Sequence, residues 1–439
     1  WDGDEIVVAQ NLKVDLSAPG PEDPLTYQFD VNSGDESGRM TGEGTLTFAP
    51  EDPFDIQRIK ADSKLVINSW ELEEVLKLFD SGTFFAAVKG RLNANFALTG
   101  NAAGNLLLLG NLSIPELKMH GGPFGSDTPV VSDIAIKMEA GGTPDAISLN
   151  DLTFTSSLAA GSARGTFDSG KNHRLSGSAD LDLAEISRQV PGTIKLREGT
   201  AITNGKMTLS AKLNVAGDSA NFEGNARIDR IQGIRREKKI SWNKPVTANA
   251  VGELRPDGVQ LENLSLRSAF LNADGQGNLE NMTVRLAADI NAALKEFRKF
   301  IELQPWDGSG KLKLALDLKK KSKNISHAAI SADLKRFFMV RGGSRILPKQ
   351  DIQIDFNTTV KTGQTLSATK LSQPNLVITS SLARGKLSAA HTAWNAVSGM
   401  PDISGIELHT KLNLKQLSSV LRNLKTLTPD TSLEGESTI

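Results

Sequence analysis

The chain has 439 residues, with 50 Lys and Arg against 51 Asp and Glu, and a formal net charge of −1. This length allows two or three ordinary domains or one long repeat array, and the balanced charge gives no reason to expect a nucleic acid as partner. Cysteine is absent, which excludes disulfides, a thiol nucleophile and a Cys-ligated metal. The sequence starts without methionine and stops in what reads as a strand, so we expect a fragment of a longer protein.

Alternation of apolar and polar residues recurs along the chain, at 91–98, 133–138, 206–215, 310–318 and 351–356. In "GKLKLALDLKKK" the four leucines from Leu312 to Leu318 occupy every second position. Successive side chains of a strand point to opposite faces, so this pattern predicts strands with one apolar face. Gly, Asn, Asp and Ser separate the segments, as expected for antiparallel meanders.

Short stretches with helical period interrupt the strands. They are "SWELEEVLKLF" (69–79), "LAEISRQV" (183–190), "INAALKEFRKFI" (290–301) and "LKQLSSVLRNL" (414–424). Their apolar residues fall on one side of a helix, which predicts amphipathic helices packed on the sheet.

These helices belong to a degenerate repeat of roughly 105 to 125 residues. Each predicted helix follows a strand, at Ile67, Leu183, Ile290 and Leu414, and a glycine opens a new segment after it. A second element precedes the helices, in "NDLTFTSSLAAGSARGTF", "ENLSLRSAFLNADGQGNL" and "PNLVITSSLARGKL". We expect N-terminal strands of a partial repeat at 1–60, repeat units at 61–180, 181–285 and 286–405, and the start of a further unit at 406–439.

Catalytic and metal-binding patterns are weak. The five histidines lack metal-ligand spacing, no GxSxG motif occurs, and paired carboxylates such as Asp180 and Asp182 fall on the polar side of strands. We therefore expect neither an enzyme nor a cofactor or metal. The basic runs at 235–239 and 319–323 are expected to be solvated loop ends, with contact to a membrane surface as the alternative.

Elements such as "NLSLRSAFLNADGQGNL", "ADLDLAEISRQV", "GKMTLSAKLNVAG" and "GKLKLALDLKKK" resemble the AsmA-like family of bacterial envelope proteins, which is related to TamB-like and bridge-like lipid-transfer proteins. The resemblance runs from about Lys60 to the C-terminus. It implies an all-β protein whose elongated, repetitive antiparallel sheet curls into a taco-like groove with an apolar interior, with a few short helices. It also implies a periplasmic protein, anchored to the inner membrane by a segment outside this chain, that carries phospholipid toward the outer membrane.

On this interpretation the partners are phospholipid acyl chains, a membrane reached through parts outside the chain, and envelope proteins at its ends. The candidate groove residues are Leu209, Leu213, Val215, Leu312, Leu314, Leu316, Leu318, Ile352, Ile354 and Phe356.

Two other interpretations of the apolar faces are open. A structural or adhesive envelope protein would fill its own core, as a sandwich or a barrel. An outer-membrane barrel needs aromatic girdles, which one tyrosine and five tryptophans do not favour.

Overall fold

The structure is a computed structural model. It describes residues 9–20, 23–33, 37–48, 60–73, 87–101, 104–143, 145–278, 280–303, 306–322, 325–361, 370–394, 401–423 and 435–438. Strands make up 75% of it and helices 9%. The chain divides into two units, Trp1–Ser241 and Trp242–Ile439.

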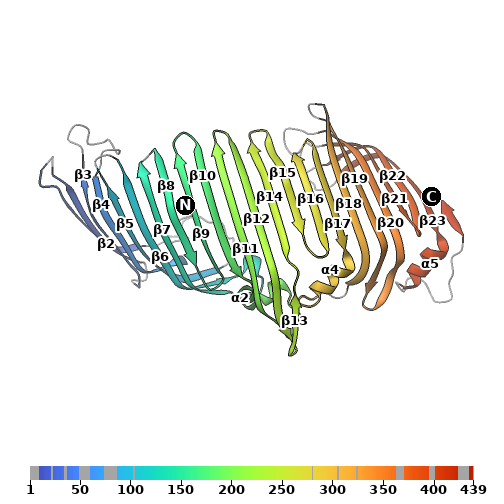
Figure 1. The fold of residues 1–439 in the computed structure, drawn as a ribbon, viewed down its shortest axis with the longest axis horizontal. Helices are drawn as coiled ribbons and strands as arrows, with labels where there is room; N and C mark the ends of the chain where they lie inside the picture. Colours follow the sequence, from blue (N-terminus) through green and yellow to red (C-terminus); the bar gives the residue numbers. More distant parts are fainter. Residues whose placement is uncertain are drawn as a thin grey trace. The chain divides into compact units, whose positions relative to one another are not determined.

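The first unit is an antiparallel meander in which each strand from β1 to β12 pairs with the next. Figure 1 shows β2 to β12 side by side in chain order. Their bounds are β1 Ala9–Ser17, β2 Leu25–Ser33, β3 Arg39–Thr47, β4 Lys60–Glu71, β5 Ala87–Gly100, β6 Leu106–His120, β7 Val130–Thr143, β8 Ala146–Thr155, β9 Ala159–Asp168, β10 Asn172–Asp182, β11 Thr200–Ala216 and β12 Ser219–Arg235. The short β13, Lys238–Trp242, follows β12 after a tight turn.

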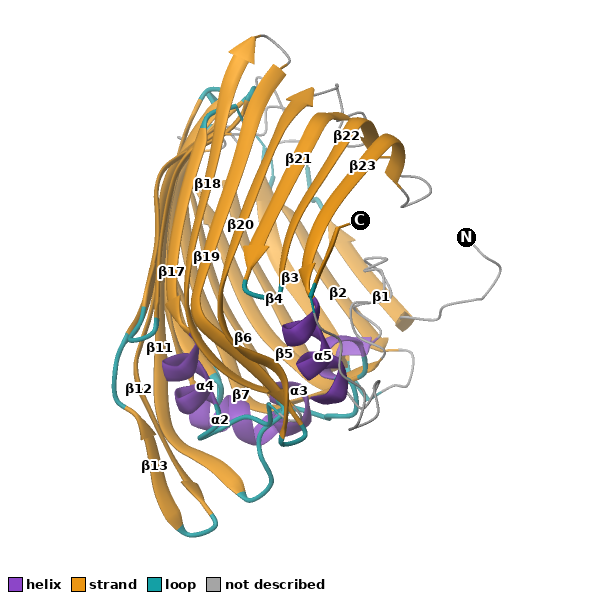
Figure 2. Cartoon of the chain, turned by 90° about the vertical axis from the view of Figure 1, so that its right-hand side faces the viewer, coloured by secondary structure: helices purple, strands orange, loops and turns teal. Residues whose placement is uncertain are grey.

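The second unit continues the same pattern, with each strand from β14 to β24 paired antiparallel to the next. Figure 2 shows that its sheet bends from β17 across to β23. The strands are β14 Val246–Arg255, β15 Gly258–Arg267, β16 Leu271–Asn278, β17 Met282–Asp289, β18 Trp306–Ser322, β19 Ile325–Arg341, β20 Ser344–Lys361, β21 Lys370–Ser380, β22 Ala383–Trp394, β23 Pro401–Asn413 and β24 Glu436–Thr438. In the described part of each unit, the first and last strands are not paired with each other, so the sheet is open in both units.

Three of the four predicted helices are confirmed, as α2 (Leu183–Gln189), α4 (Ile290–Phe297) and α5 (Leu414–Asn423). Helices α2, α4 and α5 pack on β11, β18 and β20 respectively. The predicted helix at 69–79 lies largely outside the described residues. Two short helices were not predicted, η2 (Gly122–Phe124) and α3 (Pro191–Ile194). Within the residues that are described, no helix has the length and hydropathy needed to cross a membrane.

The same local geometry recurs before each of the three helices. The Oγ of Ser156 accepts hydrogen bonds from the N–H groups two and three residues later, at 3.2 and 3.1 Å. Ser268 and Ser380 form the same turn. Each turn sets up a hairpin of two strands, and the third strand then ends in a capping residue: Asp182, Asp289 or Asn413. The recurrence supports a repeat, whereas the exact unit boundaries stay a prediction.

The large buried side chains gather at the end of the strands that carries the helices. In the second unit Trp242, Phe270 and Phe297 pack with ring centroids 5.3 to 5.5 Å apart, and Phe300 is buried. In the first unit Trp70, Leu92, Ile114, Val131 and Val190 are buried. Helix packing therefore closes one end of each sheet, and most of the remaining apolar face stays outside these clusters.

Candidate functional site

The second unit carries a continuous apolar face, because the apolar residues of neighbouring strands lie in register. Leu316 on β18 is paired with Val284 on β17 and with Ile330 on β19. The same row continues through Phe356, Leu376, Leu387 and Leu408 on β20 to β23. Parallel rows pass through Leu312, Leu314 and Leu318, and the first two of these rows include Ile352 and Ile354. All seven candidate residues of this unit therefore share one face.

The first unit has an equivalent face, on which its three candidate residues lie. Leu213 on β11 is paired with Leu175 on β10 and Phe222 on β12. Leu209 is paired with Ala179 and Ala226. Val215 is paired with His173, whose ring lies 5.8 Å from that of Phe167.

These faces are only partly covered. None of the ten candidate residues is buried. Large apolar side chains on the same face remain open to solvent, with Ile147 46% exposed, Leu264 41% and Leu408 55%. A sandwich or filled barrel would bury such residues, so no second layer of the described chain covers them.

The accessible surface supports the same conclusion. It amounts to 27169 Å² for a mass of 47.1 kDa. A compact protein of this mass exposes about 16,000 Å², and two separate domains of half the mass about 20,000 Å² together. The accessible surface of the chain is larger than both reference values, so it exceeds the expectation for one compact protein and also for two separate compact domains.

The opposite face is polar and carries cross-strand ion pairs. Arg285 on β17 donates two hydrogen bonds to Asp317 on β18, at 2.8 and 2.9 Å. This guanidinium, together with the Thr283 hydroxyl, holds the pKa of Asp317 below its ordinary value. Arg267 pairs with Asp274 on the same side. Carboxylates here neutralise arginines, which is the arrangement of a solvated sheet face.

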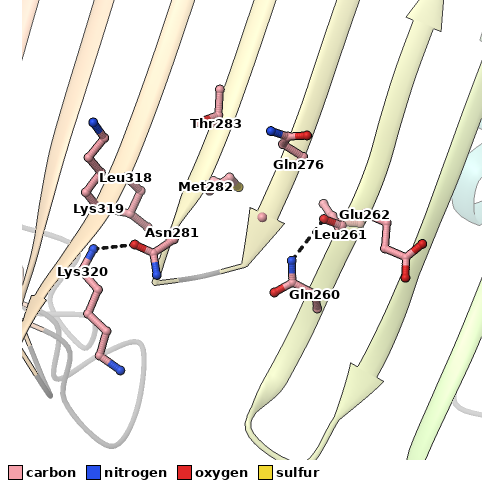
Figure 3. Close-up of a pocket in the computed structure, with 11 residues that line it drawn as sticks. Gln260, Leu261, Glu262, Gln276, Asn281, Met282, Thr283, Leu318, Lys319 and Lys320 are labelled. Carbon is pink, nitrogen blue, oxygen red and sulfur yellow. Dashed lines mark hydrogen bonds between the residues drawn. The ribbon is translucent and has the colours of Figure 1, made fainter.

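A hollow of about 600 Å³ lies at the strand ends far from α4, where residues of both faces come together. Figure 3 shows the residues that line it. Gln276 and Thr283 line it from the polar side, and Met282 and Leu318 belong to the apolar rows. The N–H of Lys320 donates to the Oδ1 of Asn281 at 3.0 Å. The Lys320 Nζ lies 2.5 Å from Glu280. This lining offers amides, a hydroxyl, ammonium groups and the carboxylate of Glu262 next to apolar surface.

Several residues of the apolar face were missed by the sequence analysis. They include Val284, Leu286, Ile330 and Ala332, which lie beside the candidate leucines. Their signal was present as alternation in "MTVRLAAD" and "ISHAAISADL", with alanines in place of larger residues. On β10 the face includes His173 and Gly177, which no apolar pattern would select.

Among the described residues, no cluster of three or more His, Asp or Glu side chains is arranged to hold a metal ion. No protein-family model matches the chain, and no curated protein matches its sequence. The site is therefore defined by its own geometry: an in-register, partly exposed apolar face backed by a polar one.

Proposed function

We propose that the chain is a non-enzymatic lipid-binding segment that holds phospholipid acyl chains on its apolar faces and passes them between membranes. The observation that carries this proposal is the partial exposure of an apolar face that runs in register across successive strands. Covering one half-exposed leucine gains about 1 kcal/mol, so a ligand that covers several gains several times this amount.

Acyl chains suit such a face because it offers aliphatic groups and few directional bonds. The candidate residues are Leu, Ile, Val and Phe, which resemble the interior of a bilayer. A chain that slides from one strand to the next exchanges equivalent contacts and breaks no hydrogen bond. Selectivity among acyl chains would be low, and movement along the face would need no nucleotide.

The hollow in Figure 3 offers a place for the polar end of such a lipid in the second unit. Its amide groups and the Lys319 ammonium can donate to a phosphate, whereas the Lys320 ammonium is paired with Glu280. Met282 and Leu318 continue into the apolar rows. A lipid lying there would keep its headgroup in water and its acyl chains on the leucines.

The wider assignment is part of the same proposal: membership of the AsmA-like family, a periplasmic location, and a role in outer-membrane assembly or homeostasis. The curved, repeat-like antiparallel sheet with short helices at one strand end supports it. The alternative, a structural or adhesive envelope protein, requires a core filled by protein, and the open face argues against it.

The test is mass spectrometry of an organic extract from the purified chain, with an equal mass of a lipid-free β-protein extracted alongside. Phospholipid in molar excess over that control supports the proposal. A clean extract from a folded, monodisperse sample, which also takes up no phospholipid from vesicles, overturns it and favours the structural alternative.

A further inference from the structure

A basic hairpin extends from the strand end of the first unit that carries α2. Arg236 and Glu237 form its two-residue turn, between β12 and β13. Figures 1 and 2 show this hairpin reaching past the ends of the neighbouring strands. We call residues 234–239 the hairpin tip.

The hairpin tip is dense in positive charge. Arg235, Arg236, Lys238 and Lys239 stand against the single carboxylate of Glu237, so its net charge is four minus one, or +3. Three of these cations, Arg236, Lys238 and Lys239, are exposed. In the part of the chain that the structure describes, none of the four makes an ion pair with a carboxylate, unlike the arginines of the strand faces.

The segment beside the tip does not neutralise it. The N–H of Arg236 donates to the carbonyl of Gly199 at 3.1 Å, which places residues 195–199 next to the turn. This segment adds Lys195 and Arg197 and one carboxylate, Glu198. The surroundings therefore raise the local positive charge.

The turn geometry does not account for the charged residues. Arg236 and Glu237 both have positive φ, 46° and 68°. Hairpin turns of this kind favour Asn and Gly, because other side chains are strained at positive φ. The sequence places charge at positions where local stability would select smaller residues.

An exposed aliphatic residue accompanies the cations. Ile234, next to Arg235 on β12, is 41% exposed. Surfaces that bind lipid headgroups combine cations with apolar side chains that enter the interface. A surface that binds single-stranded nucleic acid would add aromatic side chains for stacking, and the hairpin tip has none.

We propose that the hairpin tip binds the surface of a membrane that contains anionic lipid. The tip would hold one strand end of the first unit at that membrane, with its cations at the phosphates and Ile234 at the headgroup boundary. This inference does not depend on lipid occupying the apolar faces, because the two surfaces are made of different residues.

The test is flotation of the 439-residue chain with vesicles of phosphatidylcholine alone and with vesicles of phosphatidylcholine and phosphatidylglycerol in equal amounts. The test variant changes the four tip cations to glutamine: Arg235→Gln, Arg236→Gln, Lys238→Gln and Lys239→Gln. The matched control removes the same charge from exposed positions on the polar strand faces: Lys64→Gln, Lys137→Gln, Arg164→Gln and Arg174→Gln. Two half-variants, each changing one pair of tip cations, serve if the fourfold variant does not fold.

We expect the wild-type chain to bind the anionic vesicles at low salt, to bind the neutral vesicles poorly, and to be released as salt is raised. Each cation near an anionic surface contributes roughly fivefold in affinity, so each half-variant should lose at least tenfold and the control little. Ile234→Ser should weaken binding without changing its salt dependence. Three results would overturn the proposal. The wild-type chain could bind neutral and anionic vesicles equally well, or both half-variants could bind anionic vesicles as tightly as the wild type. The chain could also bind a short DNA duplex more tightly than anionic vesicles at the same salt concentration.

Discussion

The ring of Phe154 on β8 lies across Gly161 on β9, so close that a Cβ at Gly161 would be 2.4 Å from the ring and 2.5 Å from the carbonyl oxygen of Ser178. Phe29 lies across Gly42 in the same way. An aromatic residue on one strand thus covers the backbone of the next. The apolar face of the first unit depends on having no side chain at these glycines.

Gly161→Ala should therefore destabilise the first unit by about 1 to 3 kcal/mol, because the added methyl group forces the ring or the backbone to move. Gly224→Ala is the matched control, since Gly224 lies on the same face and no atom outside its chain neighbours is within 4 Å of its Cβ position. Urea unfolding followed by circular dichroism compares them. Equal midpoints for the two variants would show that the close contact is not restrictive.

The proposed lipid site predicts a difference between the two faces of β18. Leu314→Gln and Leu316→Gln place polar groups in the apolar rows, and each should weaken lipid binding roughly fivefold by removing about 1 kcal/mol of apolar contact. Lys311→Gln and Lys313→Gln change the opposite face of the same strand and should leave the lipid content unchanged. The measurement is the molar ratio of extracted phospholipid to folded chain. A loss confined to the lysine pair would mean that lipid is held by charge and not by the leucines.

The Asp127 carboxylate joins two segments that are far apart in the sequence, and this contact should be lost in acid. The hydroxyl and the N–H of Thr193 donate to its Oδ2 at 2.7 and 2.6 Å, and the N–H of Gly192 donates to Oδ1 at 3.2 Å. These donors, the Thr193 hydroxyl first, lower the pKa of Asp127. A lowered pKa in the folded state stabilises the contact above the unfolded pKa of about 3.9 and removes that stabilisation as the pH falls through the folded value.

Hydrogen exchange of peptides that cover residues 190–195 measures this effect. Protection, corrected for the intrinsic rate, should be constant near neutral pH and fall below about pH 4. Asp127→Asn should lower protection at neutral pH and remove the acid-dependent fall. If protection still falls in acid in this variant, the fall is caused by the titration of another group.

The residues that cap the helices recur at equivalent positions of the repeat. Replacing each of them should therefore lower the stability of the protein by a similar amount. Asp182 accepts from the N–H groups of Ala184 and Glu185, at 2.8 and 3.0 Å, and Asp289 accepts from that of Ala292, at 2.9 Å. Replacing either Asp by Ala should cost about 1 kcal/mol of stability. The Asn variants should recover most of it, because Asn also caps helices. Failure of Asn to rescue either site would point to a role for the charge itself.

Alternation was enough to predict which residues of a strand share a face, as with Leu312 to Leu318 on β18. It could not predict strand pairing, because bulges shift the register by non-local contacts, for example between Ser309 and Lys311 and between Leu334 and Phe337. The short α3 was missed for a similar reason, since its N-terminal N–H groups are bound by Asp127, 65 and 66 residues away.

In the candidate site, too, local alternation predicted part of the arrangement and non-local packing decided the rest. The leucines of β18 were selected because large residues repeat, whereas β19 contributes alanines to the same rows and gave a weaker signal. Which face stays uncovered depends on how the sheet bends and where the helices dock. Those features follow from packing between elements that are distant in the sequence, such as α5 on β20, and no local pattern encodes them.

Helix α4 should be held to the second unit chiefly by its aromatic contacts. The ring of Phe297 lies 5.5 Å from that of Trp242 and 5.3 Å from that of Phe270. Phe297→Ala should cost about 3 kcal/mol, the lower end of the range for this change, because the side chain is half-buried. Lys295→Ala changes an exposed position of the same helix and should cost little. Hydrogen exchange of peptides that cover residues 289–300 measures this loss of stability. If the aromatic cluster anchors α4, protection falls in the Phe297 variant alone. Equal protection in both variants would place the anchor elsewhere on the helix.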